Sequence, residues 1–273
     1  MRAAGRRRLS ATGRQVLIAD PDLTLLWAEA ETDALRAICY PGALRYGAFP
    51  TSDEPVDAAG TPDDILAVLP GGEAPASVLH ISCHAVAGPH PTRSALRLAA
   101  GPGADPDTGL LTVARILDDA DPPPQDAAGS LVVLSACETD LSTRNHDESL
   151  TLATALVARG ATDAVGSRWA ARDSRTAVMM AVSHHFLTAD GLTPPDALRA
   201  AQLWMLDPDR TPPPTLHGKL RDEATAVDLD RIHHWAAFTR RSSPRTTSAG
   251  APAAPTHSSR CGDDPAAGGA ALR

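Results

Sequence analysis

Short apolar runs alternate with amphipathic segments along most of the chain. The apolar runs have the length of buried β-strands and are bounded by turn-forming residues. They lie at residues 16–19, 77–84, 131–137 and 164–169. Residues 94–98 alternate between apolar and polar side chains, which is typical of an edge or hairpin strand. Residues 233–241 form a last candidate element.

Segments with apolar residues at helical spacing lie between these runs. The predicted helices cover residues 29–38, 61–69, 112–117, 148–159, 175–187 and 195–206. Gly160 directly follows one of them, and Gly191 lies just beyond another, where glycine commonly ends a helix. Residues 118–129 contain three successive prolines and are predicted to be a loop. Strands that alternate with helices predict an α/β fold with a mostly parallel sheet and helices on both of its faces.

The two ends of the chain differ from its middle in composition. Residues 1–13 are basic and are predicted to be a flexible lead-in. Residues 242–273 are rich in Ser, Pro, Ala and Gly, a composition that predicts disorder. Residues 14–241 are therefore predicted to form one folded domain.

Composition and charge narrow the classes of function. Hydrophobic residues make up 43% of the chain and aromatic residues 3%, so the core is expected to be aliphatic and rich in alanine. The net charge of −8 argues against a nucleic-acid-binding surface. Neither a secretory signal nor an apolar run long enough to span a membrane is evident. Four cysteines without a CxxC pair indicate a reduced, cytoplasmic setting, and the abundance of Arg, Ala, Gly and Pro is typical of a GC-rich bacterial genome.

Two of the predicted strands end in side chains that can do chemistry. Residues 77–84 end at His84, and residues 131–137 end at Cys137. Ligands of open α/β sheets bind beyond the carboxyl ends of the strands. If the two strands are neighbours, the imidazole can draw the proton from the thiol and stabilise the thiolate, which is the attacking species. The residues alone leave a second interpretation open, because cysteine is also among the most buried and inert residue types.

Several segments together resemble one known family. They include "VLHISCHA", "LVVLSACETD", "ESLTLATALVARGATDAVGSRW", "DSRTAVMMAVSHHFL" and "WAAF". In this order, from about Gln15 to Phe238, they are similar to the CHAT domain, a caspase-like cysteine peptidase family related to caspases and separases. The resemblance implies a caspase-like three-layer α/β/α fold.

The resemblance also implies roles for individual residues. Cys137 would be the nucleophile and His84 the general base, about fifty residues before it. Backbone N–H groups at Cys137 and Ala85 would form the oxyanion hole. The implied activity is that of a cysteine-type peptidase, which cleaves peptide bonds in protein substrates through an acyl-enzyme and needs no cofactor.

The chain departs from the family pattern at identifiable positions. Ala85 stands where the family usually has glycine after the histidine, and its Cβ is acceptable there only with a negative φ. Arg168 and Ala171 replace apolar residues, and "AAFTRRSSP" replaces an apolar final strand. These departures keep two alternatives open. One is an interaction or regulatory module with impaired catalysis, and the other is a thiol redox sensor that uses Cys137 with Cys83.

Four more residues are candidates for the substrate cleft. Glu138 and Asp140 follow the cysteine and either shape the cleft, orient the loop or lie in a solvated turn. Trp169 and Asp173 remain from a family segment that follows the next strand. Asp173 either lines the pocket or caps the helix that follows it, and the cap is the favoured interpretation.

The remaining histidines and cysteines are interpreted as structural. His80 lies four residues before His84, about 13 Å along a strand, so the two cannot chelate one metal ion. His80 and Cys83 are therefore expected to be core residues, and no metal site is predicted. The expected partners are a protein substrate and a separate activator or recruiting repeat protein, with no nucleic acid and no membrane. A chain that is a fragment of a larger protein would explain the missing repeat module equally well.

Overall fold

A computed structural model describes residues 13–118, 129–137, 139–140, 150–214 and 216–243. The predictions for most of the basic lead-in, the proline-rich loop and the tail fall outside these residues, as does that for Glu138.

A six-stranded sheet forms the centre of the fold, in the order β2-β1-β3-β7-β8-β9. Its strands are β1 (Gln15–Ala19), β2 (Leu44–Gly47), β3 (Val78–Ser82), β7 (Leu131–Ser135), β8 (Asp163–Ser167) and β9 (Phe238–Ser242). The first five strands in this order are parallel, and β9 pairs antiparallel with β8. The mostly parallel sheet that the sequence predicts is confirmed.

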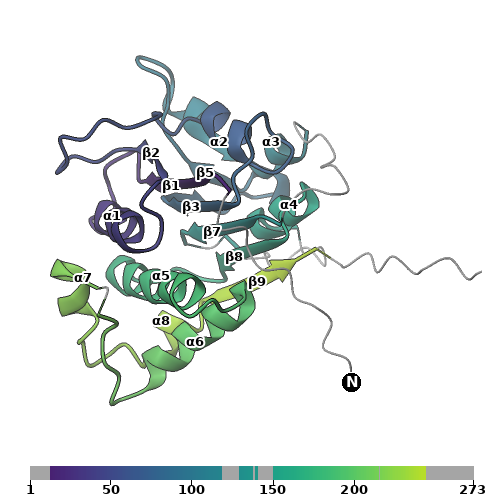
Figure 1. Ribbon diagram of the computed structural model, residues 1–273. Helices are drawn as coiled ribbons and strands as arrows, with labels where there is room; N and C mark the ends of the chain where they lie inside the picture. The colour runs from purple at the N-terminus through teal and green to yellow at the C-terminus, as the bar shows by residue number, and fades with distance from the viewer. Residues whose placement is uncertain (1–12, 119–128, 138, 141–149, 215, 244–273) are drawn as a thin grey trace, which may run out of the picture. The chain divides into compact units, whose positions relative to one another are not determined.

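Helices cover both faces of the sheet and make a three-layer α/β/α arrangement (Figure 1). One face carries α2 (Pro62–Val68), α3 (Val113–Asp118) and α4 (Leu152–Ala158). The other carries α1 (Ala28–Ile38), α5 (Asp173–Thr188) and α6 (Pro194–Leu206). The short helices α7 (Gly218–Glu223) and α8 (Ile232–Trp235) pack against α5.

Alternate residues of the central strands enter two different cores. Val132 and Leu134 pack in the cluster that includes residues of α2, α3 and α4. Leu131 and Val133 of the same strand pack against α5 and α6. Because both faces of the sheet are covered, its central strands are apolar on both sides, and this is why they appear in the sequence as continuous apolar runs.

A second, small sheet extends from the end of β3. Its antiparallel strands are β4 (His84–Val86), β5 (Ala95–Arg97) and β6 (Leu110–Thr112), with short 3₁₀ turns at Pro91–Arg93 and Pro106–Gly109 between them. The predicted strand 77–84 is therefore wrong at its end. The chain leaves the central sheet after Ser82, bends at Cys83 and starts β4 at His84.

Other differences from the predicted elements are local. β2 and α7 were not predicted, and residues 233–241 divide into α8 and β9. The predicted helix 148–159 begins at Leu152, because Thr151 forms a capping box with Thr154. The folded domain also extends beyond its predicted end at residue 241, because β9 includes Ser242, and the N–H of Ser243 donates to the carbonyl of Thr162 at 3.2 Å.

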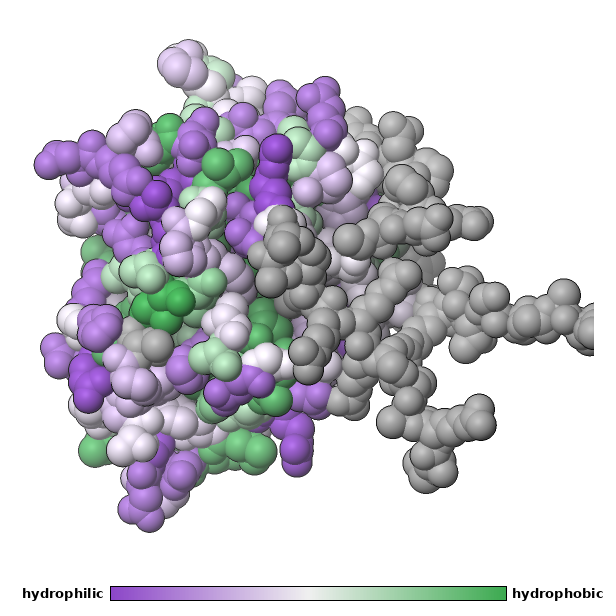
Figure 2. Space-filling model, in the orientation of Figure 1, coloured by the Kyte–Doolittle hydropathy of each residue, from purple (hydrophilic) through white to green (hydrophobic). Residues whose placement is uncertain are grey.

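The visible surface is mixed in character. Figure 2 shows hydrophilic residues over much of this face, with hydrophobic residues in separate spots between them. Within the described part of the chain, none of the helices combines the length and the apolar character that crossing a bilayer requires.

Candidate active site

The two predicted catalytic residues leave the central sheet side by side. β3 and β7 are adjacent and parallel, and Ser82 lies opposite Ser135 at their carboxyl ends. His84 and Cys137 each follow two residues later, so the topology brings the imidazole and the thiol to one edge of the sheet. Both residues are partly exposed and can be reached from solvent. The predicted neighbourhood of the two strands is thus confirmed.

The turn that carries Cys137 is held by residues at the end of β8. The hydroxyl of Ser167 donates to the carbonyl of Ala136 at 2.6 Å, and the N–H of Ser167 donates to Oγ1 of Thr139 at 2.8 Å. The carbonyl of Ser167 accepts from the N–H of Asp140 at 2.7 Å. Three hydrogen bonds from one residue therefore fix the chain on both sides of Cys137. Sequence reasoning missed the roles of Ser167 and Thr139, whose only signal was a small polar residue at the end of β8 and another after β7.

Asp140 is a buried anchor and lies in neither a solvated turn nor the substrate cleft. Its side chain is 0% exposed and accepts from the hydroxyls of Thr151 at 2.9 Å and Thr239 at 2.5 Å. Nε of Arg241 donates to both of its carboxylate oxygens at 3.0 Å. The placement of Asp140 among cleft candidates is therefore wrong, because nothing of its carboxylate reaches the surface. Orienting the loop is the role that the contacts support.

The same contacts account for the unusual final strand. Arg241 pairs with Asp140 from β9, and Arg240 pairs with Asp163 of β8 at 2.7 Å. The arginines that replace an apolar continuation are thus matched by carboxylates of the adjacent elements. A charged last strand is compatible with this fold because each charge has a partner.

Ala85 sits in β4 without backbone strain. Within the described residues, Leu23 is the only non-glycine residue with a positive φ, so Ala85 meets the condition for a Cβ at this position. Its side chain packs against the core on the α2–α4 side. Gly88 is the glycine that the nearby turn requires, because a Cβ there would lie 2.6 Å from the carbonyl carbon of Arg93. The use of the Ala85 N–H in an oxyanion hole stays a prediction.

Asp173 is not the N-cap that the sequence favoured. Arg172 occupies the cap position of α5, and Asp173 is the first helical residue. Its Oδ2 accepts from the N–H of Trp27 at 3.0 Å, which ties α5 to the start of α1. Burial, followed by the nearby charge of Glu31, raises the pKa of Asp173 to about 6, while the charge of His84 acts in the opposite direction. Asp173 therefore lies within electrostatic reach of His84, at the edge of the candidate site.

Replacing Asp173 by asparagine should change how stability depends on pH. The pKa of Asp173 is about 6 in the folded protein against 3.8 for an unperturbed aspartate, so the folded state binds the extra proton between these values. The free energy of unfolding of the native chain therefore gains a contribution as pH falls from about 6 to 4 and loses it as pH rises. We expect about 1 kcal/mol, reduced by solvent screening at this partly exposed site.

Urea unfolding of the native chain and Asp173→Asn at pH 7.5, 5.5 and 4.5 measures this effect. The stability of the variant relative to the native chain should fall as pH falls. Asp53→Asn, at an exposed position, is the control. Parallel pH curves for the native chain and Asp173→Asn would contradict the assignment.

Trp169 and Cys83 differ in their exposure to solvent. Trp169 follows β8 at the same sheet edge, is 36% exposed, and donates its indole N–H to the carbonyl of His233 at 3.1 Å. Cys83 is 1% exposed in the core, and burial raises its pKa. A buried, protonated thiol is a poor partner for disulfide exchange with Cys137, which weighs against the redox-sensor alternative.

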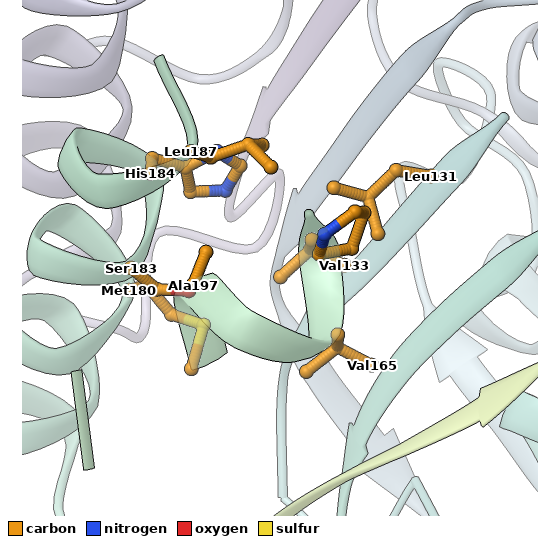
Figure 3. Close-up of a pocket in the computed structure, with 9 residues that line it drawn as sticks. Leu131, Val133, Val165, Met180, Ser183, His184, Leu187 and Ala197 are labelled. Carbon is orange, nitrogen blue, oxygen red and sulfur yellow. The ribbon is translucent and has the colours of Figure 1, made fainter. Parts of the chain in front are cut away.

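A small cavity is separate from His84 and Cys137, the candidate dyad. It has a volume of about 10 Å³, roughly the space for one water molecule. Figure 3 shows His184 and Leu187 of α5 on one side and Leu131 and Val133 of β7 on the other. It lies within the layer between the sheet and α5 and is not a substrate pocket for Cys137. Among the described residues, no group of three or more His, Cys, Asp or Glu side chains is placed to hold a metal ion.

The fold and the site together define a class of protein. A mostly parallel six-stranded sheet lies between two helical layers, as in the caspase-like three-layer α/β proteins. A histidine and a cysteine follow two adjacent strands at its carboxyl edge. The family model of the CHAT domain matches residues 2–242, and the chain belongs to this family. The resemblance inferred from the sequence is confirmed. A search of curated proteins finds no match to the chain.

Proposed function

We propose that the protein is a cysteine endopeptidase that cleaves peptide bonds in protein substrates. The observation that carries the proposal is the position of His84 and Cys137, two residues beyond the paired ends of adjacent parallel strands and partly exposed. Membership of the CHAT family, which implies a caspase-like cysteine peptidase, supports the same conclusion.

The proposed reaction uses the dyad in two half-reactions. His84 takes the proton of the Cys137 thiol, and the thiolate attacks the carbonyl carbon of the scissile bond. His84 then protonates the leaving amine as the C–N bond breaks, which leaves a thioester on Cys137. In the second half, His84 takes a proton from water, the hydroxide attacks the thioester, and the thiol is restored. Backbone N–H groups at Cys137 and Ala85 are the proposed donors to the oxyanion.

Exposed apolar side chains at the strand ends fit a peptide substrate. Leu23 is 58% exposed and Leu26 is 81% exposed, both in the loop after β1. The carboxylate of Asp20, 2% exposed, holds this loop by accepting from the N–H groups of Thr24 at 2.6 Å and Leu25 at 2.7 Å.

Two further apolar residues lie near the dyad. Val86, two residues after His84, is 42% exposed, and Trp169 follows the neighbouring strand β8. Solvent-exposed apolar side chains around a polar dyad provide a surface on which a peptide can bury its own side chains. Glu138 remains a cleft candidate on the sequence alone.

A peptide probe with an acyl-type thiol-reactive group tests the proposal. The native chain should become labelled at Cys137, and Cys83→Ala should be labelled equally, because Cys83 is buried away from solvent. Cys137→Ala should lose labelling, and His84→Ala should label far more slowly. Labelling that persists in Cys137→Ala, or that keeps the native rate in His84→Ala, would refute the proposed peptidase function.

Control of such an activity is a further part of the proposal. An ungated endopeptidase in the cytoplasm would damage its own cell. We therefore propose a separate activator or recruiting protein that brings the substrate. The interaction-module alternative rested on strain at Ala85, and the strand conformation of Ala85 gives it no support.

A further inference from the structure

A carboxylate is buried directly behind the candidate dyad. Glu31 of α1 is 1% exposed, and its Oε2 accepts from the hydroxyl of Ser82 at 3.1 Å and from that of Ser135 at 3.1 Å. These two serines lie opposite each other in the pairing of β3 with β7. One carboxylate oxygen thus bridges the last residues of the two strands from which His84 and Cys137 emerge.

The other oxygen of Glu31 faces a chain of buried polar groups. Oε1 lies 2.9 Å from Nε2 of His80, and Nδ1 of His80 lies 3.2 Å from Nε2 of His184. Nδ1 of His184 in turn lies 2.7 Å from the hydroxyl of Tyr40. Burial lowers the pKa of His184 well below its usual value, so this imidazole is neutral. The chain connects α1, β3 and α5 and fixes where the Glu31 carboxylate lies.

Stability alone is a weak explanation for this arrangement. A carboxylate loses its hydration on burial, and well-packed apolar residues in place of a buried charged group are often neutral or stabilising. Elsewhere on this face, Leu131 and Val133 of β7 and Val165 of β8 pack among apolar side chains of α5 and α6. The carboxylate lies instead where it bridges the ends of β3 and β7.

We propose that Glu31 is a positioning residue for the dyad and acts through Ser82 and Ser135. By binding both hydroxyls with one oxygen, it sets the separation of the ends of β3 and β7. The dyad residues lie two positions further on, about 7 Å along each chain, so a small change at the serines moves the imidazole relative to the thiol. Misplacement of reacting groups by about 1 Å can cost two orders of magnitude in rate. This inference rests on the proposed function of the dyad.

The chain offers a matched control for the two serines. Ser77 and Ser130 directly precede the same two strands at their amino ends, far from the dyad. They are 8% and 7% exposed, against 1% and 4% for Ser82 and Ser135. The double variants Ser82→Ala/Ser135→Ala and Ser77→Ala/Ser130→Ala therefore remove the same groups from opposite ends of the same strands.

The experiment measures alkylation of Cys137 by iodoacetamide from pH 5 to 9, followed by mass spectrometry of the peptide that contains Cys137. Urea unfolding of each variant runs in parallel. We expect Ser82→Ala/Ser135→Ala to lower the alkylation rate at pH 7 at least 10-fold and to shift the midpoint of its pH profile upward. The control double variant should keep the native rate and midpoint. The single variants Ser82→Ala and Ser135→Ala leave the Glu31 carboxylate one hydroxyl partner and should show smaller losses of alkylation rate. They provide the test if the double variant does not fold.

The outcomes separate this inference from the proposed function. If native Cys137 alkylates at the same rate in His84→Ala, the dyad itself fails, and the role of Glu31 falls with it. If alkylation depends on His84 but the Ser82 and Ser135 variants keep the native rate and midpoint, only the positioning role is refuted. An equal loss of alkylation rate in the control double variant would also refute the positioning role, because the effect would then reflect general destabilisation.

Discussion

Replacing His84 by alanine is expected to lower kcat for peptide hydrolysis about 10³-fold, with little change in KM. His84 follows β3 at the sheet edge where Cys137 follows β7. Its imidazole is proposed to move a proton in both half-reactions, and proton transfer by a positioned side chain contributes about 10² to 10⁴ in rate. KM should change little because the exposed side chains of Leu23 and Leu26, which are proposed to bind substrate, stay in place.

The measurement is the release of fluorescent fragments from labelled, denatured casein at several substrate concentrations. His217→Ala, which changes an exposed histidine before α7, is the control and should retain the native kcat. A His84→Ala enzyme with a kcat within threefold of the native value would contradict the proposed role of the imidazole.

Replacing Asp140 by alanine is expected to lower the free energy of unfolding by about 3 kcal/mol and to abolish labelling of Cys137 by the peptide probe. The carboxylate is buried and holds two threonine hydroxyls and the Arg241 guanidinium. Its removal leaves these donors unmatched and frees the turn that follows Cys137. This residue thus affects both stability and reactivity without touching the substrate.

Urea unfolding and probe labelling of the same preparations check this result. Asp53→Ala, at an exposed aspartate, should leave both measurements unchanged. If Asp140→Ala labels at the native rate under conditions where it is folded, the turn does not depend on this anchor, and the interpretation is wrong.

The sequence was sufficient for the parts of the fold that depend on local pattern. The apolar runs that became β1, β3, β7 and β8 are buried on both sides, and such burial leaves a clear pattern in the sequence. The placement of His84 and Cys137 at one edge of the sheet was also predictable, because each residue lies two positions beyond the end of such a strand. Parallel neighbours place their ends together.

The supports of the site were not predictable, because they come from elements distant in the sequence. Glu31 lies on α1, about fifty residues before Ser82 and about a hundred before Ser135. Asp140 meets Arg241 across about a hundred residues. An acidic residue in a polar stretch has the same local pattern whether it ends in solvent or in the core. Asp140 was therefore placed among the cleft residues, and Glu31 was not considered.

The antiparallel final strand has a consequence for the order in which the protein is made. Thr239 and Arg241 of β9 hold the carboxylate that anchors the turn after Cys137, although they are about a hundred residues further along the chain. During synthesis, Cys137 and His84 leave the ribosome long before β9 does. The turn therefore cannot reach its final form until nearly the whole domain has emerged. A partly made chain carries both residues of the dyad and still lacks the anchored turn, which would delay the proposed peptidase activity until the fold is complete.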